Sequence, residues 1–247
     1  IRKGRLPNLS QLGGLGSETY TDEVYERIVS RICVLKSLDY VKESLHQLKP
    51  LNHEDSIIHP EHGVDSAIIR SLLTFVLVEN LLCQLDGQEV VEIGAGIATF
   101  AATVMTLSTP KRYTIYDLPD ILELQKLFLR RVLPSSKFDR IRFCSAHEIS
   151  GNESFDLVYS TYAFSELEFS VAEKYLENVV KQSKVGFMTY NHLGSKFHVR
   201  NMEIFDLCKR LLAGDSCTES IEIRADELFK LGAGGDPSCC NVLWRMR

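Results

Sequence analysis

Apolar residues recur at three- and four-residue steps over the first part of the chain. Between residues 22 and 48 these positions are Val24, Ile28, Ile32, Leu35, Leu38, Val41, Leu45 and Leu48. This is the period of one face of an α-helix, so the segment predicts one or two amphipathic helices that end at Pro50. Residues 67–85 are apolar on nearly every side instead, which predicts a helix packed on a sheet, with Asp65 or Ser66 as its N-cap.

From residue 88 onward, short β-branched runs alternate with helical patterns. The expected strands are residues 89–93, 113–116, 141–144, 155–160, 184–190, 218–223 and 241–246, and the expected helices are residues 97–107, 121–132, 171–182 and 201–212. This alternation predicts an α/β, Rossmann-like doubly wound seven-stranded sheet. The last two strands have no long crossover helix between them, so we expect an antiparallel C-terminal strand pair.

The sequence predicts three consecutive parts. Residues 1–17 are basic and then rich in glycine, which is typical of a linker or a mobile lead-in. Residues 18–86 are expected to form an N-terminal helical cap or lid, and residues 87–247 the Rossmann-like core. Because the chain begins with Ile1, we expect either a processed form or a piece of a longer polypeptide with an upstream domain.

Charge and cysteine usage narrow the classes of function. The net charge of −5 argues against a protein that holds nucleic acid chiefly through its phosphates. The seven cysteines are scattered and form no C-x-x-C pair, so we expect a reducing, cytoplasmic setting with neither a disulfide framework nor a zinc site. No apolar run has the length of a membrane span, and no signal peptide is recognised.

The most informative stretch is the expected buried strand 89–93, which is followed by a glycine turn. Gly94 and Gly96 let the backbone turn tightly and approach a ligand, and the helix that follows would point free N–H groups at it. Asp117 ends the next strand, where a carboxylate can accept hydrogen bonds from both hydroxyls of a ribose. Two interpretations remain open. One is a G-x-G-x-x-G dinucleotide site, in which Thr99 replaces the third glycine, and the other is an E-x-G-x-G site for S-adenosylmethionine that includes Glu92.

A polar segment over residues 52–64 carries three histidines and three acidic residues. A metal site is one interpretation, but no pair of histidines has an H-x-x-x-H spacing in a clear helix, so we expect no metal there. The alternative is a loop over the mouth of the site that contacts cofactor or substrate, with His62 as the substrate-binding candidate.

Several motifs together resemble a known family. Glu92-Ile93-Gly94-Ala95-Gly96 resembles the first motif of class I S-adenosylmethionine-dependent methyltransferases, and Tyr116-Asp117-Leu118-Pro119 resembles the D-L-P turn of small-molecule O-methyltransferases. Residues 155–158 with Phe164-Ser165-Glu166-Leu167, the strand that ends in Tyr190-Asn191, and the terminal Val242-Leu243-Trp244 are similar to the putative sugar O-methyltransferase family. The resemblance covers roughly residues 55–247, and Ala98 stands where many methyltransferases have a third glycine.

The resemblance implies an O-methyltransferase that uses S-adenosylmethionine, releases S-adenosylhomocysteine and acts on a hydroxyl of a sugar or glycan. The expected cofactor-binding residues are Glu92, Gly94, Gly96, Asp117, Leu118, Ala146, His147 and Ser160. A sugar hydroxyl is a poor nucleophile and needs a general base, for which His192 and Glu166 are the catalytic candidates. Tyr162 and Asn191 are expected to hold the acceptor, together with His62.

Three alternatives stay open. In the first, the acceptor is another small hydroxylated molecule, such as a phenol. In the second, the chain is a nicotinamide-dependent oxidoreductase. The missing third glycine and the closing strand pair argue against the oxidoreductase. The third alternative is a degenerate fold kept as an interaction module, and the intact Glu92, Gly94, Gly96 and Asp117 argue against it. A glycosyltransferase in the upstream part would supply a glycan acceptor to the methyltransferase.

Overall fold

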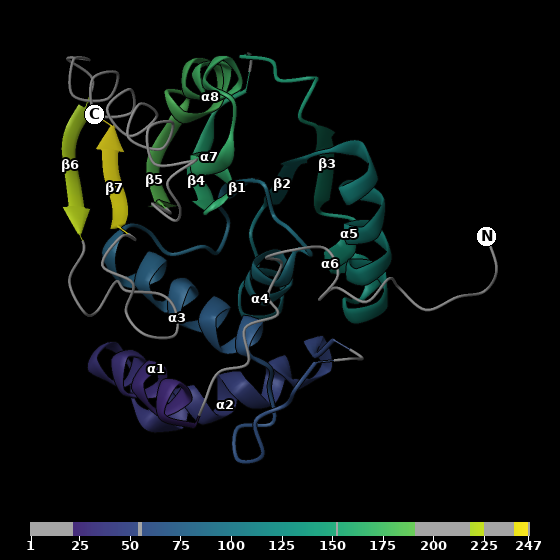
Figure 1. Cartoon of the computed structure of the whole chain (residues 1–247), viewed down its shortest axis with the longest axis vertical. Helices are drawn as coiled ribbons and strands as arrows, with labels where there is room; N and C mark the ends of the chain where they lie inside the picture. Colours follow the sequence, from purple (N-terminus) through teal and green to yellow (C-terminus); the bar gives the residue numbers. More distant parts are fainter. Residues whose placement is uncertain (1–21, 54–55, 152, 191–217, 225–239, 247) are drawn as a thin grey trace.

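The strands of the protein form one mixed sheet in a computed structural model (Figure 1). The structure describes residues 22–53, 56–151, 153–190, 218–224 and 240–246. The order in the sheet is β3-β2-β1-β4-β5-β7-β6. The strands are β1 (Glu89–Ile93), β2 (Arg112–Asp117), β3 (Ile141–Ser145), β4 (Phe155–Thr161), β5 (Ser183–Tyr190), β6 (Thr218–Arg224) and β7 (Cys240–Met246).

Strands β1 to β5 run parallel, whereas β7 runs antiparallel to both β5 and β6. The α/β class, the Rossmann-like order and the antiparallel closing pair are therefore confirmed. In β1, Val91 lies beside Thr114 of β2 and Val158 of β4, so this strand is central and buried on both faces. Buried β-branched runs suit such a position. Because the strands are parallel, the carboxyl ends of β1, β2 and β4 meet at one edge of the sheet.

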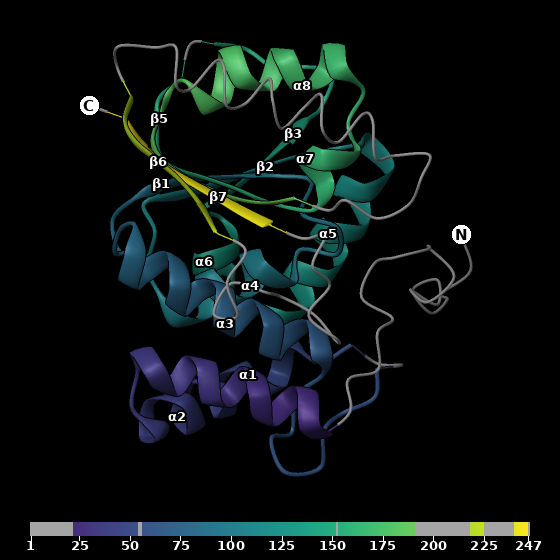
Figure 2. The same cartoon turned by 60° about the vertical axis from the view of Figure 1, so that its left-hand side comes forward.

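Helices cover both faces of the sheet, as Figure 2 shows. One face carries α3 (Ser66–Leu81), α4 (Thr99–Leu107) and α5 (Pro119–Val132), whose apolar side chains join one buried cluster. The other face carries α7 (Ala163–Glu166), α8 (Phe169–Tyr175) and a π-helical turn, η3 (Leu176–Val180), which join a second cluster. The short helix α6 (Ser135–Phe138) precedes β3.

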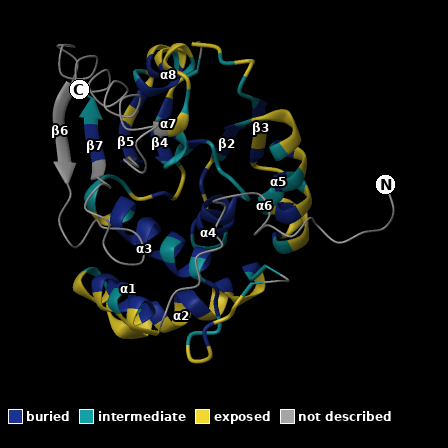
Figure 3. Ribbon diagram, viewed as in Figure 1, coloured by how far each residue is buried: buried dark blue, intermediate teal, exposed yellow. Residues whose placement is uncertain are grey.

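A further helical layer explains the unusual pattern of α3. Helices α1 (Asp22–Leu35) and α2 (Leu38–Leu48) pack on the side of α3 that faces away from the sheet, and a 3-10 turn, η2 (Lys49–Leu51), follows them (Figure 2). Helix α3 is thus buried between two layers, which Figure 3 shows as mostly dark blue. The expected N-cap is confirmed, because Asp65 Oδ1 accepts a hydrogen bond of 2.9 Å from the backbone N–H of Ile68.

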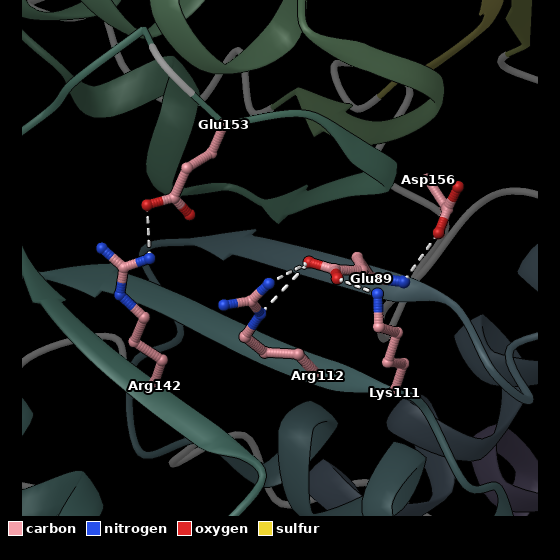
Figure 4. Close-up of polar contacts among 6 residues, drawn as sticks. All are labelled: Glu89, Lys111, Arg112, Arg142, Glu153 and Asp156. Atoms are coloured by element: carbon pink, nitrogen blue, oxygen red, sulfur yellow. Dashed lines mark hydrogen bonds and ion pairs between the residues drawn. The ribbon is translucent and has the colours of Figure 1, made fainter.

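Ion pairs join the amino ends of the strands, at the opposite edge from the glycine turn (Figure 4). Glu89 at the start of β1 pairs with Lys111 at 2.8 Å and with Arg112 at 2.7 Å. Its backbone N–H donates to Asp156 at 2.8 Å, and Asp156 also pairs with Lys184 at 2.6 Å. In addition, Arg142 of β3 pairs with Glu153. These contacts align the strand starts, and their partly exposed positions make each worth little stability on its own.

The structure adds details that the pattern did not predict. The helix expected at 171–182 starts at Phe169 and ends in the π-helical turn η3, and α7 is an extra short helix before it. In the closing pair, Gly186 of β5 lies opposite Trp244 of β7, and a Cβ atom at Gly186 would overlap the indole ring. The expected helix 201–212 and lead-in 1–17 lie outside the described residues, and the division at residues 86 and 87 stays a prediction.

Candidate functional site

A cavity of about 520 Å³ opens at the carboxyl edge of the sheet, where β1, β2 and β4 end. Its walls come from α3, the glycine turn, the end of β2, the end of β4 and α7. The residues that line it and enter the argument below are Arg70, Ser71, Thr74, Glu92, Gly94, Gly96, Thr99, Phe100, Asp117, Leu118, Ala146, Tyr159, Thr161, Tyr162, Ala163 and Glu166. Open α/β sheets bind their ligands at this edge, so the cavity is the candidate site.

The floor of the cavity is the turn between β1 and α4. Gly94 has φ +70° and Gly96 has φ +58°, which are left-handed conformations that favour glycine. Gly94 also packs against α7, because a Cβ atom there would overlap the side chain of Ala163. Ala98 has φ +65° although it is not glycine. This is the position where the family pattern has a third glycine, and the backbone keeps the glycine-like conformation there.

Asp117 is held at the end of β2 by donors from Leu118 and from helix α5. Its Oδ1 accepts from the backbone N–H of Leu118 at 2.8 Å, and its Oδ2 accepts from Nε2 of Gln125 at 2.7 Å. The backbone N–H groups of Ala95 and Gly96 also favour its charged form. Partial burial raises the pKa of Asp117, and these hydrogen bonds oppose that rise. The carboxylate is thus fixed between the glycine turn and α5, with part of its surface open to the cavity.

Glu92 is the most buried acid of the cavity wall, with 3% of its surface exposed. Its Oε2 accepts a hydrogen bond of 2.7 Å from the hydroxyl of Tyr113. Burial raises the pKa of Glu92 to about 8, against the hydrogen bond from Tyr113, and the nearby charge of Asp117 adds to the rise. Its surroundings thus disfavour the ionised form of this carboxyl. A cationic group of a ligand beside it would favour the ionised form instead.

The inner wall of the cavity is rich in hydroxyl groups. The hydroxyl of Tyr159 in β4 accepts a hydrogen bond from the hydroxyl of Thr161, and Thr74 of α3 lies near enough to favour its charged form. Its ring stacks on Phe100 with the ring centroids 3.8 Å apart. Burial raises the pKa of Tyr159, so the phenol stays protonated. Arg70 lines the same wall, which therefore offers both donors and acceptors to a polar ligand.

Tyr162 and Glu166 lie at the other end of the cavity. Tyr162 has φ +64°, which is costly for a large side chain, and its backbone N–H bonds to Thr189 at 3.0 Å. This strained turn starts α7 and directs it across the cavity. Glu166 ends α7 with a side chain that is exposed in part, and desolvation of its carboxyl by the neighbouring protein raises its pKa.

The structure brings most of the predicted cofactor residues together and separates others from the cavity. Glu92, Gly94, Gly96, Asp117, Leu118 and Ala146 all line it. Ser160 does not. Its buried Oγ donates to the carbonyl of Ile93 at 2.9 Å and accepts from the N–H of Phe164 at 3.2 Å, so it joins β1 to α7. His147 is exposed in the turn after β3 and is not among the lining residues.

His62 is also absent from the cavity wall, because it belongs to a cluster on α1. Its Nε2 lies 3.1 Å from Glu26, and its ring stacks on that of His59. His59 in turn lies 3.1 Å from Asp22 and packs on the ring of Tyr25. The side chains of His59 and His62 thus hold this part of the polar segment 52–64 against α1. The other expected residues, Asn191 and His192, lie outside the described residues.

The sequence analysis did not predict that residues of α3 line the cavity, or that Gln125 contacts Gly96 and Asp117. Gln125 is fully buried in α5, on the stripe that also contains Leu122, Phe128 and Leu129. A glutamine at a core position of an amphipathic helix was the visible signal, since a buried amide needs partners. Arg70, Ser71 and Thr74 likewise interrupt an apolar helix at steps of one to four residues, on the side that faces the cavity.

The part of the chain that the structure describes contains neither a metal-binding cluster nor a membrane-spanning helix. No group of three or more His, Cys, Asp and Glu side chains there is arranged to hold a metal ion. No helix among the same residues combines the length and the apolar character needed to cross a membrane. Cys33, Cys83 and Cys144 are free thiols, and burial raises the pKa of Cys83 to about 11.

Comparison with known proteins finds similarity in structure only. No family model and no curated protein matches the sequence. The methyltransferase domain of a bacterial CtHen1 matches with a TM-score of 0.52 at 12% identity, over 72% of this chain and 99% of that one. The CurJ carbon methyltransferase matches with a TM-score of 0.50 at 8% identity, over 73% of this chain and 55% of that one.

A third protein extends over more of the chain. An O-methyltransferase from Bacillus cereus, solved in complex with SAH, covers 91% of this chain and 97% of its own at 12% identity, with a TM-score of 0.49. Sequence identities this low support a shared fold only, and the CtHen1 domain and CurJ provide that support. The chain has the Rossmann-like α/β fold of methyltransferases.

Proposed function

We propose that this protein is an S-adenosylmethionine-dependent O-methyltransferase that acts on a hydroxyl of a sugar or glycan. One observation supports the cofactor above all. Asp117, held by hydrogen bonds from Leu118 and Gln125, and the glycine turn of Gly94 and Gly96 border one cavity in a sheet with the fold of methyltransferases. The proposal for the acceptor rests on the motif resemblance and on the hydroxyl-rich inner wall.

The residues around the cavity fit S-adenosylmethionine in chemistry. Asp117 would accept hydrogen bonds from the ribose hydroxyls, and the backbone of Gly94 and Gly96 leaves room for the amino acid part. Leu118 and Ala146 offer apolar surface to the adenine, and 55% of Leu118 is exposed at the cavity edge. The buried carboxyl of Glu92 would face the ammonium group. When bound, this cofactor supplies a methyl group on a positively charged sulfur.

The acceptor would lie between the inner wall and the end of α7. Hydroxyl groups of Thr74, Tyr159 and Thr161 and the guanidinium of Arg70 match the many hydroxyls of a sugar. In the transfer, a C–O bond to the methyl group would form as the C–S bond breaks, S-adenosylhomocysteine would leave, and the hydroxyl proton would pass to a base. Glu166 is the described candidate, because its raised pKa brings it closer to neutral pH. His192 remains a candidate from the sequence.

Transfer of a labelled methyl group tests the proposal. The protein is incubated with methyl-labelled S-adenosylmethionine and separate panels of nucleotide sugars, free glycans and phenols, and labelled products are identified by mass spectrometry. We expect a methyl ether on a sugar hydroxyl and its loss in Asp117→Asn. Label on a phenol only would refute the sugar acceptor. No transfer to any acceptor, together with no cofactor binding, would refute the enzyme.

A further inference from the structure

Gln125 makes contacts that reach beyond packing of α5. It is fully buried, and its Nε2 donates at 2.8 Å to the carbonyl of Gly96 and at 2.7 Å to Oδ2 of Asp117. Both of its N–H bonds are therefore used, and they join the two segments that line the candidate cofactor site. Gly96 belongs to the turn after β1, whereas Asp117 ends β2, so the side chain connects the glycine turn with the proposed ribose acceptor.

Within the described part of the chain, the amide group of Gln125 forms its hydrogen bonds through its nitrogen and not through its oxygen. Oε1 is buried and has no hydrogen-bond partner among the residues that the structure describes. A flipped amide would place this oxygen against the Gly96 carbonyl and the Asp117 carboxylate, so the orientation with both donors forward is fixed. A buried unpaired oxygen opposes folding. An apolar side chain of the same length would avoid that cost but would lose both hydrogen bonds, so the contribution of the glutamine lies in the two bonds that it donates.

We propose that Gln125 is a positioning residue, which holds the Asp117 carboxylate in the orientation that accepts the ribose hydroxyls of the cofactor. The inference rests on the proposed function. Gln125 does not line the cavity, so it acts through Asp117 rather than on the ligand. Burial favours the protonated form of Asp117, whereas the hydrogen bond from Gln125 favours the carboxylate. The glutamine therefore orients the ribose acceptor and is one of the groups that favour its charged form.

A double-mutant cycle separates this role from packing. Affinity for S-adenosylhomocysteine is measured by calorimetry at pH 7.5 in the wild type, Gln125→Met, Asp117→Asn and the double variant. We expect Gln125→Met to weaken binding about five- to tenfold in the wild-type background, and less than about twofold when Asp117 is already replaced. Equal losses in both backgrounds would mean that the glutamine acts through general packing, which overturns the inference.

A pH profile of Gln125→Glu provides a second test in a side chain of the same shape. A carboxyl at this position can donate to Asp117 only while it is protonated. We expect affinity close to the wild type near pH 5.5 and a loss of about tenfold by pH 8, as two neighbouring carboxylates become charged. Gln84→Glu is the matched control, because Gln84 bonds to the backbone carbonyl of Glu79 away from the cavity.

The outcomes distinguish the inference from the function on which it rests. Binding to the wild type with a profile for Gln125→Glu that matches Gln84→Glu would reject the positioning role and keep the cofactor. Failure of the wild-type protein to bind S-adenosylhomocysteine would reject the proposed function itself. Thermal unfolding of every variant identifies a change that acts by loss of the fold, and the pH profile decides for Gln125→Met should that variant not fold.

Discussion

Glu92 should make the stability of the protein depend strongly on pH, and Glu92→Gln should remove that dependence. The carboxyl is buried beside Tyr113, and its pKa of about 8 in the folded protein compares with an ordinary value of 4.5. An acid with a raised pKa in the folded state stabilises the protein at low pH. That contribution is complete below about pH 4.5 and is lost as the pH rises through the folded value near 8.

The magnitude follows from the two pKa values. Each tenfold difference in proton affinity corresponds to about 1.4 kcal/mol. Relative to low pH, the raised pKa of Glu92 therefore lowers the free energy of unfolding by about 3 kcal/mol at pH 7 and by about 5 kcal/mol above pH 8. Gln has the same shape and does not ionise. The free energy of unfolding of Glu92→Gln minus that of the wild type should therefore increase by about 4 kcal/mol between pH 5 and pH 9.

Urea unfolding of the ligand-free protein at several pH values measures this difference. Glu89→Gln is the control on the same strand. Ion pairs with Lys111 and Arg112 lower the pKa of Glu89, so its contribution changes below about pH 4.5 and is constant between pH 5 and pH 9. A flat difference for Glu92→Gln over the same range would refute the raised pKa and with it the description of Glu92 as a buried, uncharged acid.

Three further substitutions test the geometry of the site. Gly94→Ala should cost about 2–4 kcal/mol in urea unfolding, because it combines a positive φ with overlap at Ala163, and adding Ala163→Gly should restore only part of it. Ser160→Ala should lower the free energy of unfolding by about 1–3 kcal/mol while affinity for S-adenosylhomocysteine stays near wild type, since Ser160 joins β1 to α7. A large loss of affinity would instead restore its predicted cofactor role. His62→Ala should leave that affinity unchanged in calorimetry, and a clear loss would mean that His62 reaches the ligand.

The fold could be predicted from the sequence because residue type and the spacing of apolar positions favour the same elements. The β-branched run of β1 and the apolar face of α1 each favour one structure, and both occur where they were expected. The N-cap at Asp65 was recognisable because a side-chain oxygen before an apolar run has a local function. The π-helical turn after α8 was not, since its sequence is compatible with an ordinary α-helix.

The candidate site was only partly accessible, for a physical reason. Residues of the glycine turn and Asp117 act through the backbone and through their position at a strand end, and both are local properties. Ser160 lies one residue before the end of β4, yet its side chain is buried and bonds to the carbonyl of Ile93. His62 turns toward α1 because Glu26 provides a partner there. Contacts of this kind join segments that are distant in sequence, so spacing alone does not predict them.

The central claim is that the cavity holds S-adenosylmethionine, and calorimetric titration tests it most directly. Wild-type protein and Asp117→Asn are titrated in parallel with S-adenosylmethionine, S-adenosylhomocysteine and NAD. The account predicts micromolar binding of the first two to the wild type, a loss of at least about tenfold in Asp117→Asn, and no binding of NAD. Binding of NAD alone, or equal affinity of both proteins for S-adenosylhomocysteine, would contradict it.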